Sequence, residues 1–327
     1  MAVRIEENMR IITGFEELSS EEKSAVAIGK FDGIHIGHQQ LLSRVFAQRE
    51  QGLISCVFTF DPAPEVFFGW SDGRELTTRE EKRRIFAALG VEVLVEFPMT
   101  KESAGMLPED FIREILCKRL HCAYVAAGSE LSFGRGGKGD EQLLRSLAPE
   151  LGYTVETIDK VCMEGQEVSS SYIRSLVKEG RMEECECFLG RPYSISGLVV
   201  HGNGLGNTMG IPTANLPVPA DKLVPPNGVY FSEVKILGGD SGSEKTIPIL
   251  EKKVQAISNI GVKPTIPGEN PLGVETTLFD YAGDLYAREL EITFLHHHRP
   301  EQRFAHVEAL KEQIAKDIEA CRDFYVR

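Results

Sequence analysis

The sequence predicts an α/β domain followed by a small antiparallel β-barrel that ends in a helix. Apolar runs alternate with helix-forming stretches up to about residue 182, short β-prone runs separated by glycine and proline follow, and the last segment is amphipathic. Alternating strands and helices are typical of a doubly wound parallel sheet, which binds its ligands at the carboxyl ends of the strands. We therefore expect two domains, residues 1–182 and 183–327.

The first domain contains apolar runs with the length of buried strands. They are Ala25–Ile28, Ser55–Phe60, Val91–Phe97, Ala123–Ala127 and Thr154–Ile158. Helices are expected after His38, after Thr78 and after Pro108. Thr78 and Glu81 have the spacing of a capping box, and Gly90 is placed to end the helix that this box begins.

The second domain contains β-prone runs that are too close together for helices to lie between them. They are Tyr193–Val200, Val229–Ile236, Val254–Asn259, Val274–Phe279 and Glu289–Leu295. This spacing predicts a small antiparallel barrel. In the tail, 301–324, apolar side chains recur at helical spacing, so we expect a helix that packs on the barrel. The stripe consists of Phe304, Val307, Leu310, Ile314, Ile318 and Cys321.

The composition limits the classes of function. The chain has 327 residues with a 42% apolar fraction, which is enough for two hydrophobic cores, and no apolar run is long enough to cross a bilayer. The N-terminus carries acidic residues where a signal peptide would be basic, and the seven cysteines show no paired spacing, so we expect a cytoplasmic protein without a membrane partner. The net charge of −13 disfavours nucleic acid and favours small nucleotides met by local basic groups and Mg²⁺.

A turn rich in glycine follows the first apolar run and reads Gly29-Lys30-Phe31-Asp32-Gly33-Ile34-His35-Ile36-Gly37-His38. Glycines let a backbone approach a ligand closely, and the N-terminus of a following helix favours an anion. His35 and His38 could both face a triphosphate and stabilise the charge on a leaving pyrophosphate. We expect phosphate or nucleotide contacts from Gly29, Phe31, Asp32, Gly33 and Gly37. The alternative is an ordinary strand-to-helix turn that binds nothing.

Two motifs resemble one known family. The turn has the form GxFDGxHxGHQ and resembles the HxGH nucleotidyltransferases, in particular the adenylyltransferase half of the prokaryotic bifunctional riboflavin kinase/FMN adenylyltransferase (FAD synthetase) family. Residues 197–216 resemble the flavokinase signature, which ends here in Pro212-Thr213-Ala214-Asn215. The resemblance covers nearly the whole chain. It implies a Rossmann-like nucleotidyltransferase domain followed by a six-stranded riboflavin kinase barrel with a C-terminal helix.

Riboflavin phosphorylation needs a base for the ribityl hydroxyl, a metal on the phosphates and donors for the γ-phosphoryl charge. The resemblance assigns Mg²⁺ binding to the Thr213 hydroxyl and the Asn215 amide oxygen, which are hard ligands of the kind that Mg²⁺ accepts. It assigns the base to Glu275, for which the alternative is a glutamate on a solvated strand face. Backbone donors to the phosphates are expected from the loop that contains Gly202, Gly206 and Gly210.

Flavin contacts are expected in both domains. The resemblance places them at Glu130 and Phe133 in the first domain and around Arg299 and Phe304 in the second. The three histidines 296–298 alternate across a predicted strand, so we interpret them as surface residues and assign no metal to them.

The first domain departs from the family pattern in segments that face the ligand. Ala63 stands where most relatives have the histidine of FxPHP. Glu130 and Leu131 replace the Asp or Asn and the Phe of GxDFxFG or GxNFxFG. Loss of one preorganised donor costs about 10²–10³ in rate, so Ala63 predicts a weakened adenylyltransferase rather than a lost one.

Residues 169–174 read Ser-Ser-Ser-Tyr-Ile-Arg and are similar to the family motif SSTxIR. Ser171 retains the hydroxyl of the threonine, and Arg174 retains a guanidinium that can hold a phosphate with two hydrogen bonds. We therefore expect Ser170, Ser171 and Arg174 to hold the phosphate chain, with Arg174 acting beside His35 and His38.

The motifs together predict an enzyme that phosphorylates riboflavin with MgATP to FMN and then transfers AMP from a second ATP to FMN, giving FAD and pyrophosphate. Its expected partners are riboflavin, FMN, FAD, ATP, ADP and pyrophosphate. One alternative is a riboflavin kinase with a weak or redirected first domain. Another is a regulatory flavin-binding protein, which would have no need of Thr213, Asn215 and Glu275. The sequence sets no oligomeric state.

Overall fold

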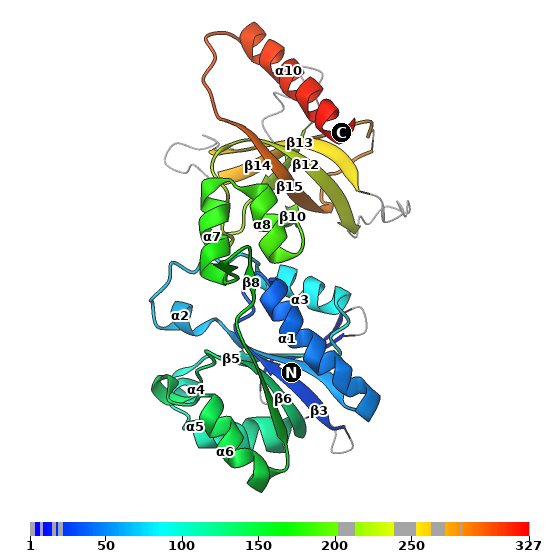
Figure 1. The fold of residues 1–327 in the computed structure, drawn as a ribbon. Helices are drawn as coiled ribbons and strands as arrows, with labels where there is room; N and C mark the ends of the chain where they lie inside the picture. Colours follow the sequence, from blue (N-terminus) through cyan, green and yellow to red (C-terminus); the bar gives the residue numbers. More distant parts are fainter. Residues whose placement is uncertain are drawn as a thin grey trace. The chain divides into compact units, whose positions relative to one another are not determined.

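The computed structural model describes residues 4–6, 9–14, 18, 22–201, 213–238, 253–262, 272–281 and 283–326. The chain forms two compact units, Met1–Ser170 and Ser171–Arg327. Figure 1 shows an open sheet with helices around it in the first unit and a strongly curved sheet with one long helix in the second. Among the described helices, none combines the length and apolar character needed to span a bilayer.

The first unit is built on a sheet in the order β1-β2-β5-β4-β3-β6-β7. All neighbouring strands from β2 to β7 are parallel, and β1 alone runs antiparallel to β2. The expected α/β sheet is therefore confirmed, with each expected strand present. The strands are β1 Arg4–Glu6, β2 Met9–Ile12, β3 Ser24–Ile28, β4 Ile54–Asp61, β5 Val93–Pro98, β6 Cys122–Gly128 and β7 Thr154–Ile158.

Both faces of this sheet are covered. On β3, Val26 and Ile28 pack into one apolar cluster, while Ala25 and Ala27 pack into another. Successive side chains of a strand point to opposite faces, so a continuous apolar run is what a sheet buried on both sides requires. The helices of this unit are α1 Ile36–Ala47, α2 Pro64–Phe67, α3 Arg79–Ala88, α4 Lys101–Ala104, α5 Pro108–Asp110, the π-helix Phe111–Arg119 and α6 Glu141–Leu151.

Local signals place several helix ends correctly. The expected capping box is present, because the Glu81 backbone N–H donates to Thr78 Oγ1 at 3.3 Å and the Thr78 N–H donates to Glu81 Oε2 at 3.0 Å. Gly90 follows this helix in the left-handed conformation, with φ of 85°. Helix α1 begins at Ile36 rather than after His38, because the His35 side chain caps it.

The second unit contains a sheet in the order β10-β15-β12-β13-β14-β11, in which all pairs are antiparallel. A bridge between Val200, just past β10, and Asn215 of β11 brings the two edge strands together, so the sheet closes on itself as the barrel prediction requires. Its elements are α7 Ser170–Glu179, α8 Met182–Leu189, β10 Tyr193–Leu198, β11 Ala214–Pro217, β12 Gly228–Gly238, β13 Val254–Val262, β14 Leu272–Leu278, β15 Glu289–Pro300 and α10 Val307–Val326.

The C-terminal helix is confirmed, although it begins at Val307 rather than near Glu301. Cys321 lies fully buried in its apolar contact with the barrel, together with Phe231 and Ile257. An ion pair adds to this contact, because the Arg299 guanidinium of β15 donates to both carboxylate oxygens of Asp317. The helix is therefore held by both apolar and charged contacts.

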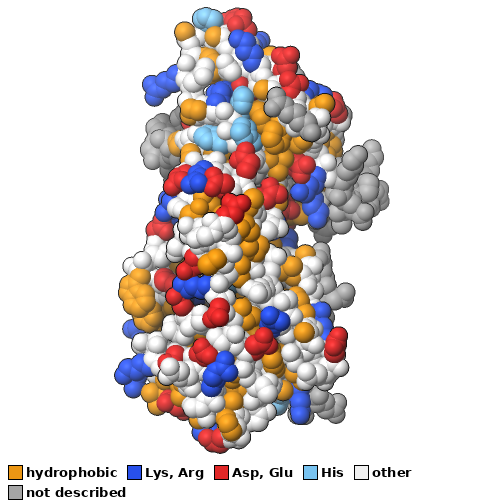
Figure 2. Space-filling view, viewed as in Figure 1, with side chains coloured by type: hydrophobic (Ala, Val, Ile, Leu, Met, Phe, Trp, Pro, Cys, Tyr) orange, Lys and Arg blue, Asp and Glu red, His pale blue; other side chains and the backbone are white. Residues whose placement is uncertain are grey.

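Strand β15 is longer than expected and includes the three histidines 296–298. Figure 2 shows histidine side chains gathered on the surface of this unit. All three are partly exposed, and they also make contacts within this unit. The His297 ring stacks on the buried Tyr230 at 4.7 Å, and His296 Nδ1 lies 2.5 Å from a carboxylate oxygen of Glu183 on α8. Burial lowers the pKa of His297 below its usual value.

Candidate active sites

The glycine-containing turn leads from β3 into α1 and is held by the core beneath it. Phe31 and Ile34 adopt left-handed conformations, with φ of 53° and 43°, and both side chains are fully buried. Such a conformation costs a residue with a side chain about 1–2 kcal/mol. Burial of the two side chains offsets that cost, so the turn keeps one shape.

His35 and His38 meet at the start of α1. The His38 backbone N–H donates to His35 Nδ1 at 3.3 Å, and the two rings stack with centroids 3.7 Å apart. A neutral His35 therefore carries its proton on Nε2. A Cβ on Gly37 would lie 3.2 Å from His35 Nδ1, so glycine gives this ring its space. Both imidazoles thus lie at a positive helix end, where an anion is favoured.

Asp32 forms hydrogen bonds within the turn, and its expected contact with a nucleotide stays a prediction. The residue is 6% exposed, and its carboxylate accepts the backbone N–H groups of Leu76 at 2.8 Å and Thr77 at 3.4 Å. The Gly33 N–H donates to Thr77 Oγ1 at 3.1 Å, and Ser170 Oγ donates to the Asp32 carbonyl at 2.9 Å. These bonds tie the turn to the segment before α3 and to Ser170, the last residue of the first unit.

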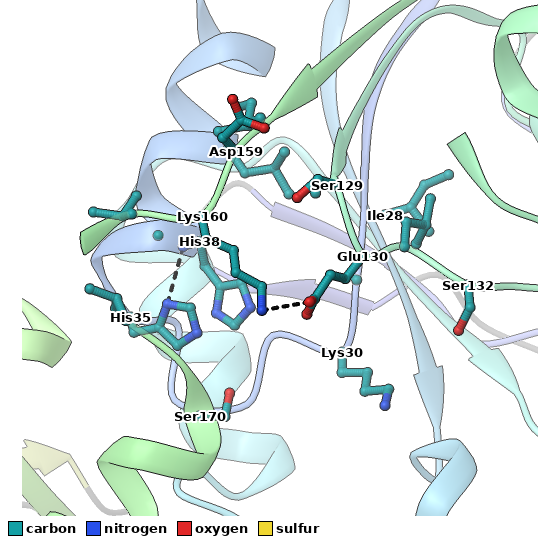
Figure 3. A pocket seen from close by; sticks show the side chains of 18 of the residues that line it. Ile28, Lys30, His35, His38, Ser129, Glu130, Ser132, Asp159, Lys160 and Ser170 are labelled. Atoms are coloured by element: carbon teal, nitrogen blue, oxygen red, sulfur yellow. Dashed lines mark hydrogen bonds and ion pairs between the residues drawn. The ribbon is translucent and has the colours of Figure 1, made fainter. Parts of the chain in front are cut away.

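A pocket of about 350 Å³ opens above this turn. Its walls come from residues at and just beyond the carboxyl ends of β3, β6 and β7, the edge at which a doubly wound sheet binds ligands. Figure 3 shows the two histidines on the same side as Ser170, facing Glu130. Of the residues expected from the sequence, the pocket is lined by Gly29, His35, Gly37, His38, Glu130, Phe133 and Ser170.

Other expected residues of this site lie differently. The Phe31 ring is buried and packs 5.1 Å from the His38 ring, so it supports the histidine from below. Ala63 precedes α2 as its N-cap without a side-chain hydrogen bond, and its neighbour Pro64 lines the pocket. Ser171 and Arg174 belong to the second compact unit, and their part in this site stays a prediction.

The sequence analysis missed Lys160, which also lines the pocket. It lies two residues beyond Ile158, the last residue of β7. The rule that ligands bind beyond the carboxyl ends of parallel strands could have indicated it, but no motif marks this segment.

In the second unit, the polar side chains come from neighbouring strands. Glu275 of β14 is paired with Asn215 of β11 on one side and with Asn259 of β13 on the other. Residues directly opposite one another point to the same face of a sheet, so these three side chains form one polar row. Asn215 Nδ2 donates to the Thr213 carbonyl at 3.3 Å, which turns the amide oxygen the other way.

The donor set near Thr213 consists of oxygen atoms and contains few charges. Within the ranges that the structure describes, no cluster of three or more His, Cys, Asp or Glu side chains could hold a metal. A hydroxyl from Thr213 and an amide oxygen from Asn215 are hard donors of the kind that suits Mg²⁺ bound largely through nucleotide phosphates. Gly202, Gly206 and Gly210 lie outside the described residues.

The expected flavin contacts of this unit, Arg299 and Phe304, both precede α10 in the chain. Phe304 is half-buried in the segment between β15 and α10. Arg299 Nη2 donates to Asp317 Oδ2 at 2.6 Å, so the guanidinium is hydrogen-bonded to α10. The neighbouring Glu301 accepts a hydrogen bond from Asn227 Nδ2 at 3.1 Å.

Two family models match the chain in succession. The model described as FAD synthetase matches residues 17–172, and the one described as riboflavin kinase matches residues 189–325. A bifunctional riboflavin kinase/FMN adenylyltransferase from Escherichia coli (strain K12) is 35% identical over 97% of this chain and 98% of its own length. The chain belongs to this bifunctional family. A protein of the same description from Pseudomonas fluorescens is 33% identical over 96% of this chain and 97% of its own length.

A solved structure supports the same fold over the whole chain. A crystal structure described as a macrolide-efflux protein from Streptococcus pneumoniae covers 95% of this chain and 99% of its own chain, with a TM-score of 0.80 and 28% sequence identity. Together with the two family models, it confirms the fold class expected from the sequence. The chain is an enzyme with an FAD synthetase domain and a riboflavin kinase domain, and the full-length relatives favour the bifunctional prediction over its alternatives.

Proposed function

We propose that this chain phosphorylates riboflavin with ATP to give FMN and ADP, and then transfers AMP from a second ATP to FMN to give FAD and pyrophosphate. The observation that carries the proposal is the presence of both matched domains in one chain, each with the polar groups that its reaction needs. Two further proposals concern which residues act and which cation they use.

In the adenylyl transfer, the FMN phosphate attacks the α-phosphorus of ATP and pyrophosphate leaves. His35 and His38 would stabilise the charge that develops on the transferred and departing phosphates, since both line the pocket at the N-terminus of α1. We assign phosphate binding to Ser170, Ser171 and Arg174 and a flavin contact to Glu130 and Phe133, as the family resemblance implies. The glycines of the turn let these phosphates approach its backbone.

In the kinase reaction, Glu275 would take the proton of the ribityl hydroxyl as it attacks the γ-phosphorus. Its place beside Asn215 in the register supports this role, because Asn215 is the expected cation ligand. Arg299 and Phe304 are proposed flavin contacts, and the loop with Gly202, Gly206 and Gly210 is proposed to bind phosphate.

Enzymes that transfer phosphoryl or adenylyl groups from ATP use a divalent cation, and we propose that it is Mg²⁺ here. A bound Mg²⁺ neutralises charge on the phosphates. Thr213 and Asn215 would hold it in the kinase domain, where the oxygen donors fit its preference.

We propose that the protein works in the cytoplasm. None of its seven cysteines forms a disulfide, and the buried ones, such as Cys56, have a raised pKa because of burial. That pattern suits a reducing compartment. The acidic net charge of −13 argues against a nucleic-acid partner.

One assay tests the function. Purified protein is incubated with riboflavin and MgATP, and riboflavin, FMN and FAD are resolved over time. We expect FMN to appear first and FAD to follow. FMN without FAD would support a kinase with an inactive first domain, and bound flavin without turnover would support a regulatory protein.

The domain boundary is a separate proposal. We expect residues 183–327 to form the kinase domain, while the compact units divide at Ser170 and Ser171 and so place α7 and α8 with the barrel. Fragments 171–327 and 183–327 can be compared for riboflavin phosphorylation. If the shorter fragment is folded but inactive, α7 belongs to the kinase domain and the boundary moves.

A further inference from the structure

The ammonium of Lys160 forms ion pairs with two carboxylates in the adenylyltransferase pocket. Its ammonium lies 2.5 Å from Glu130 Oε1 and 2.7 Å from Glu167 Oε1. Lys160 follows β7, Glu130 follows β6, and Glu167 ends the short hairpin of β8 Cys162–Met163 and β9 Gln166–Glu167. Figure 3 shows the Lys160–Glu130 ion pair reaching into the pocket near the His38 ring.

The net charge of this cluster is unfavourable for the substrates, which are anions. The three groups sum to one negative charge, yet ATP and FMN bring several more negative charges to the same pocket. Lys30, the other lysine among the lining residues, is likewise paired with a carboxylate, that of Glu65. Phosphates would be repelled unless a carboxylate leaves the ammonium.

Glu130 is the carboxylate that can leave at low cost. Its side chain is 72% exposed, compared with 40% for Glu167, and an exposed ion pair contributes only about 0–1 kcal/mol. An ammonium has three N–H donors, so Lys160 can give one to a phosphate oxygen in place of Glu130 while Glu167 still orients it.

We propose that Lys160 is a phosphate-binding residue of the adenylyltransferase site and that Glu130 occupies its ammonium until a substrate phosphate replaces it. The inference rests on the proposed adenylyl transfer and extends it. Glu167 is the positioning residue. The hydrogen bonds that its ammonium donates to both carboxylates raise the pKa of Lys160, so it stays a cation throughout the neutral range.

The test measures Mg²⁺-pyrophosphate binding to the full-length protein by titration calorimetry. Pyrophosphate is a product of adenylyl transfer and takes no part in the kinase reaction, so it reports on the first site. Lys160→Met should weaken binding by about 10- to 100-fold, the range of a hydrogen bond to a charged group. Lys160→Arg should retain most of the affinity, because the charge and donors remain.

The most discriminating prediction is that a substitution of Glu130 changes the affinity for pyrophosphate in the opposite direction. Glu130→Gln removes the competing charge and should tighten pyrophosphate binding by up to about fivefold. In the Lys160→Met background the same change should have no such effect. The matched control is Lys118→Met, because Lys118 forms an exposed ion pair with Glu114 and does not line the pocket.

If Lys160→Met and Glu130→Gln lower thermal stability but leave pyrophosphate binding unchanged, the ion pair only ties the hairpin to the sheet, and the proposal is wrong. If both weaken binding, Glu130 is a ligand partner and not a placeholder. The proposed function fails separately, through absence of FAD synthesis in the unaltered protein. If the unaltered protein synthesises FAD normally and the Lys160 variants bind pyrophosphate as it does, only this inference is wrong.

Discussion

The two units place their polar groups by different means. In the first, His35, Glu130 and Lys160 lie at or just beyond the ends of parallel strands. In the second, Asn215 and Glu275 lie within antiparallel strands and meet through register. A parallel sheet is buried on both faces, so only its ends can carry chemistry, whereas an antiparallel sheet can expose a face.

This difference predicts how the two sites respond to change. A site at strand ends depends on turns and on contacts between loops, so single residues there can be exchanged while the core is unaffected. A site on a strand face depends on register, and a slip by one residue would turn all its side chains to the other face. Four variants test whether the two units behave independently.

Glu275→Gln should have the largest effect. Loss of the general base should lower kcat for FMN formation by about 10²–10⁴, while the isosteric amide keeps the strand register. FAD synthesis from added FMN should continue at its normal rate and is the internal control. Near-normal kinase turnover would remove Glu275 from the mechanism.

His38→Ala is the corresponding change in the first unit. It should lower FAD formation by about 10²–10³, since an imidazole at the N-terminus of α1 is lost, and leave riboflavin phosphorylation unchanged. Phe31, which packs 5.1 Å from the His38 ring, remains to hold the turn. An unchanged rate of FAD synthesis would contradict the assignment of this site.

Asp317→Asn tests the contact of α10 with the barrel. Asp317 is 2% exposed, and leaving Arg299 without its carboxylate should destabilise the second unit by about 3 kcal/mol. Kinase activity of the full-length protein should then be lost at a lower temperature than in the unaltered protein. FAD synthesis from FMN should persist to its usual temperature if the units are independent.

The same pair predicts a pH dependence. Burial would raise the pKa of Asp317, but hydrogen bonds from Arg299 and Gln313 outweigh it and lower the pKa below the usual value. A lowered pKa in the folded state stabilises the protein above the unfolded pKa of about 3.9, and this contribution is lost as the pH falls through the folded value. The stability difference between Asp317→Asn and the unaltered protein should therefore shrink below about pH 4. A constant difference would point to lost packing instead.

Ala63→His should have the smallest effect and the opposite direction. Ala63 forms no side-chain cap on α2, and Pro64 beside it lines the pocket, so an imidazole would add a donor near the ligand. We expect kcat/KM for FAD synthesis to rise by about 10-fold. Ala63→Asn is a suitable control for a polar group without an imidazole. A fall in rate with His would mean that this chain has adapted to the smaller residue.

Prediction from the sequence succeeded where the signal was local. The strands of the first unit were found because continuous apolar runs, such as the four residues Ala25–Ile28 of β3, are buried on both faces. It missed α6, whose interior contains Pro149, and it missed β11, since three of the four residues of that strand fall within the expected signature. A short edge strand is defined by its partner, here β14, and not by its own composition.

The sequence by itself determined the alternation of strands and helices in the first domain, the glycine-containing turn with its paired histidines, and the family. These follow from residues near one another in the chain, whose spacing sets backbone conformation directly. Only the tertiary structure shows that Lys160 forms ion pairs with Glu130 and Glu167. It likewise pairs Asn259 with Glu275 in the register of the second sheet, and it places Arg299 in a hydrogen bond to α10. Such contacts join segments that are distant in sequence, and only packing of the sheets brings them within hydrogen-bonding distance.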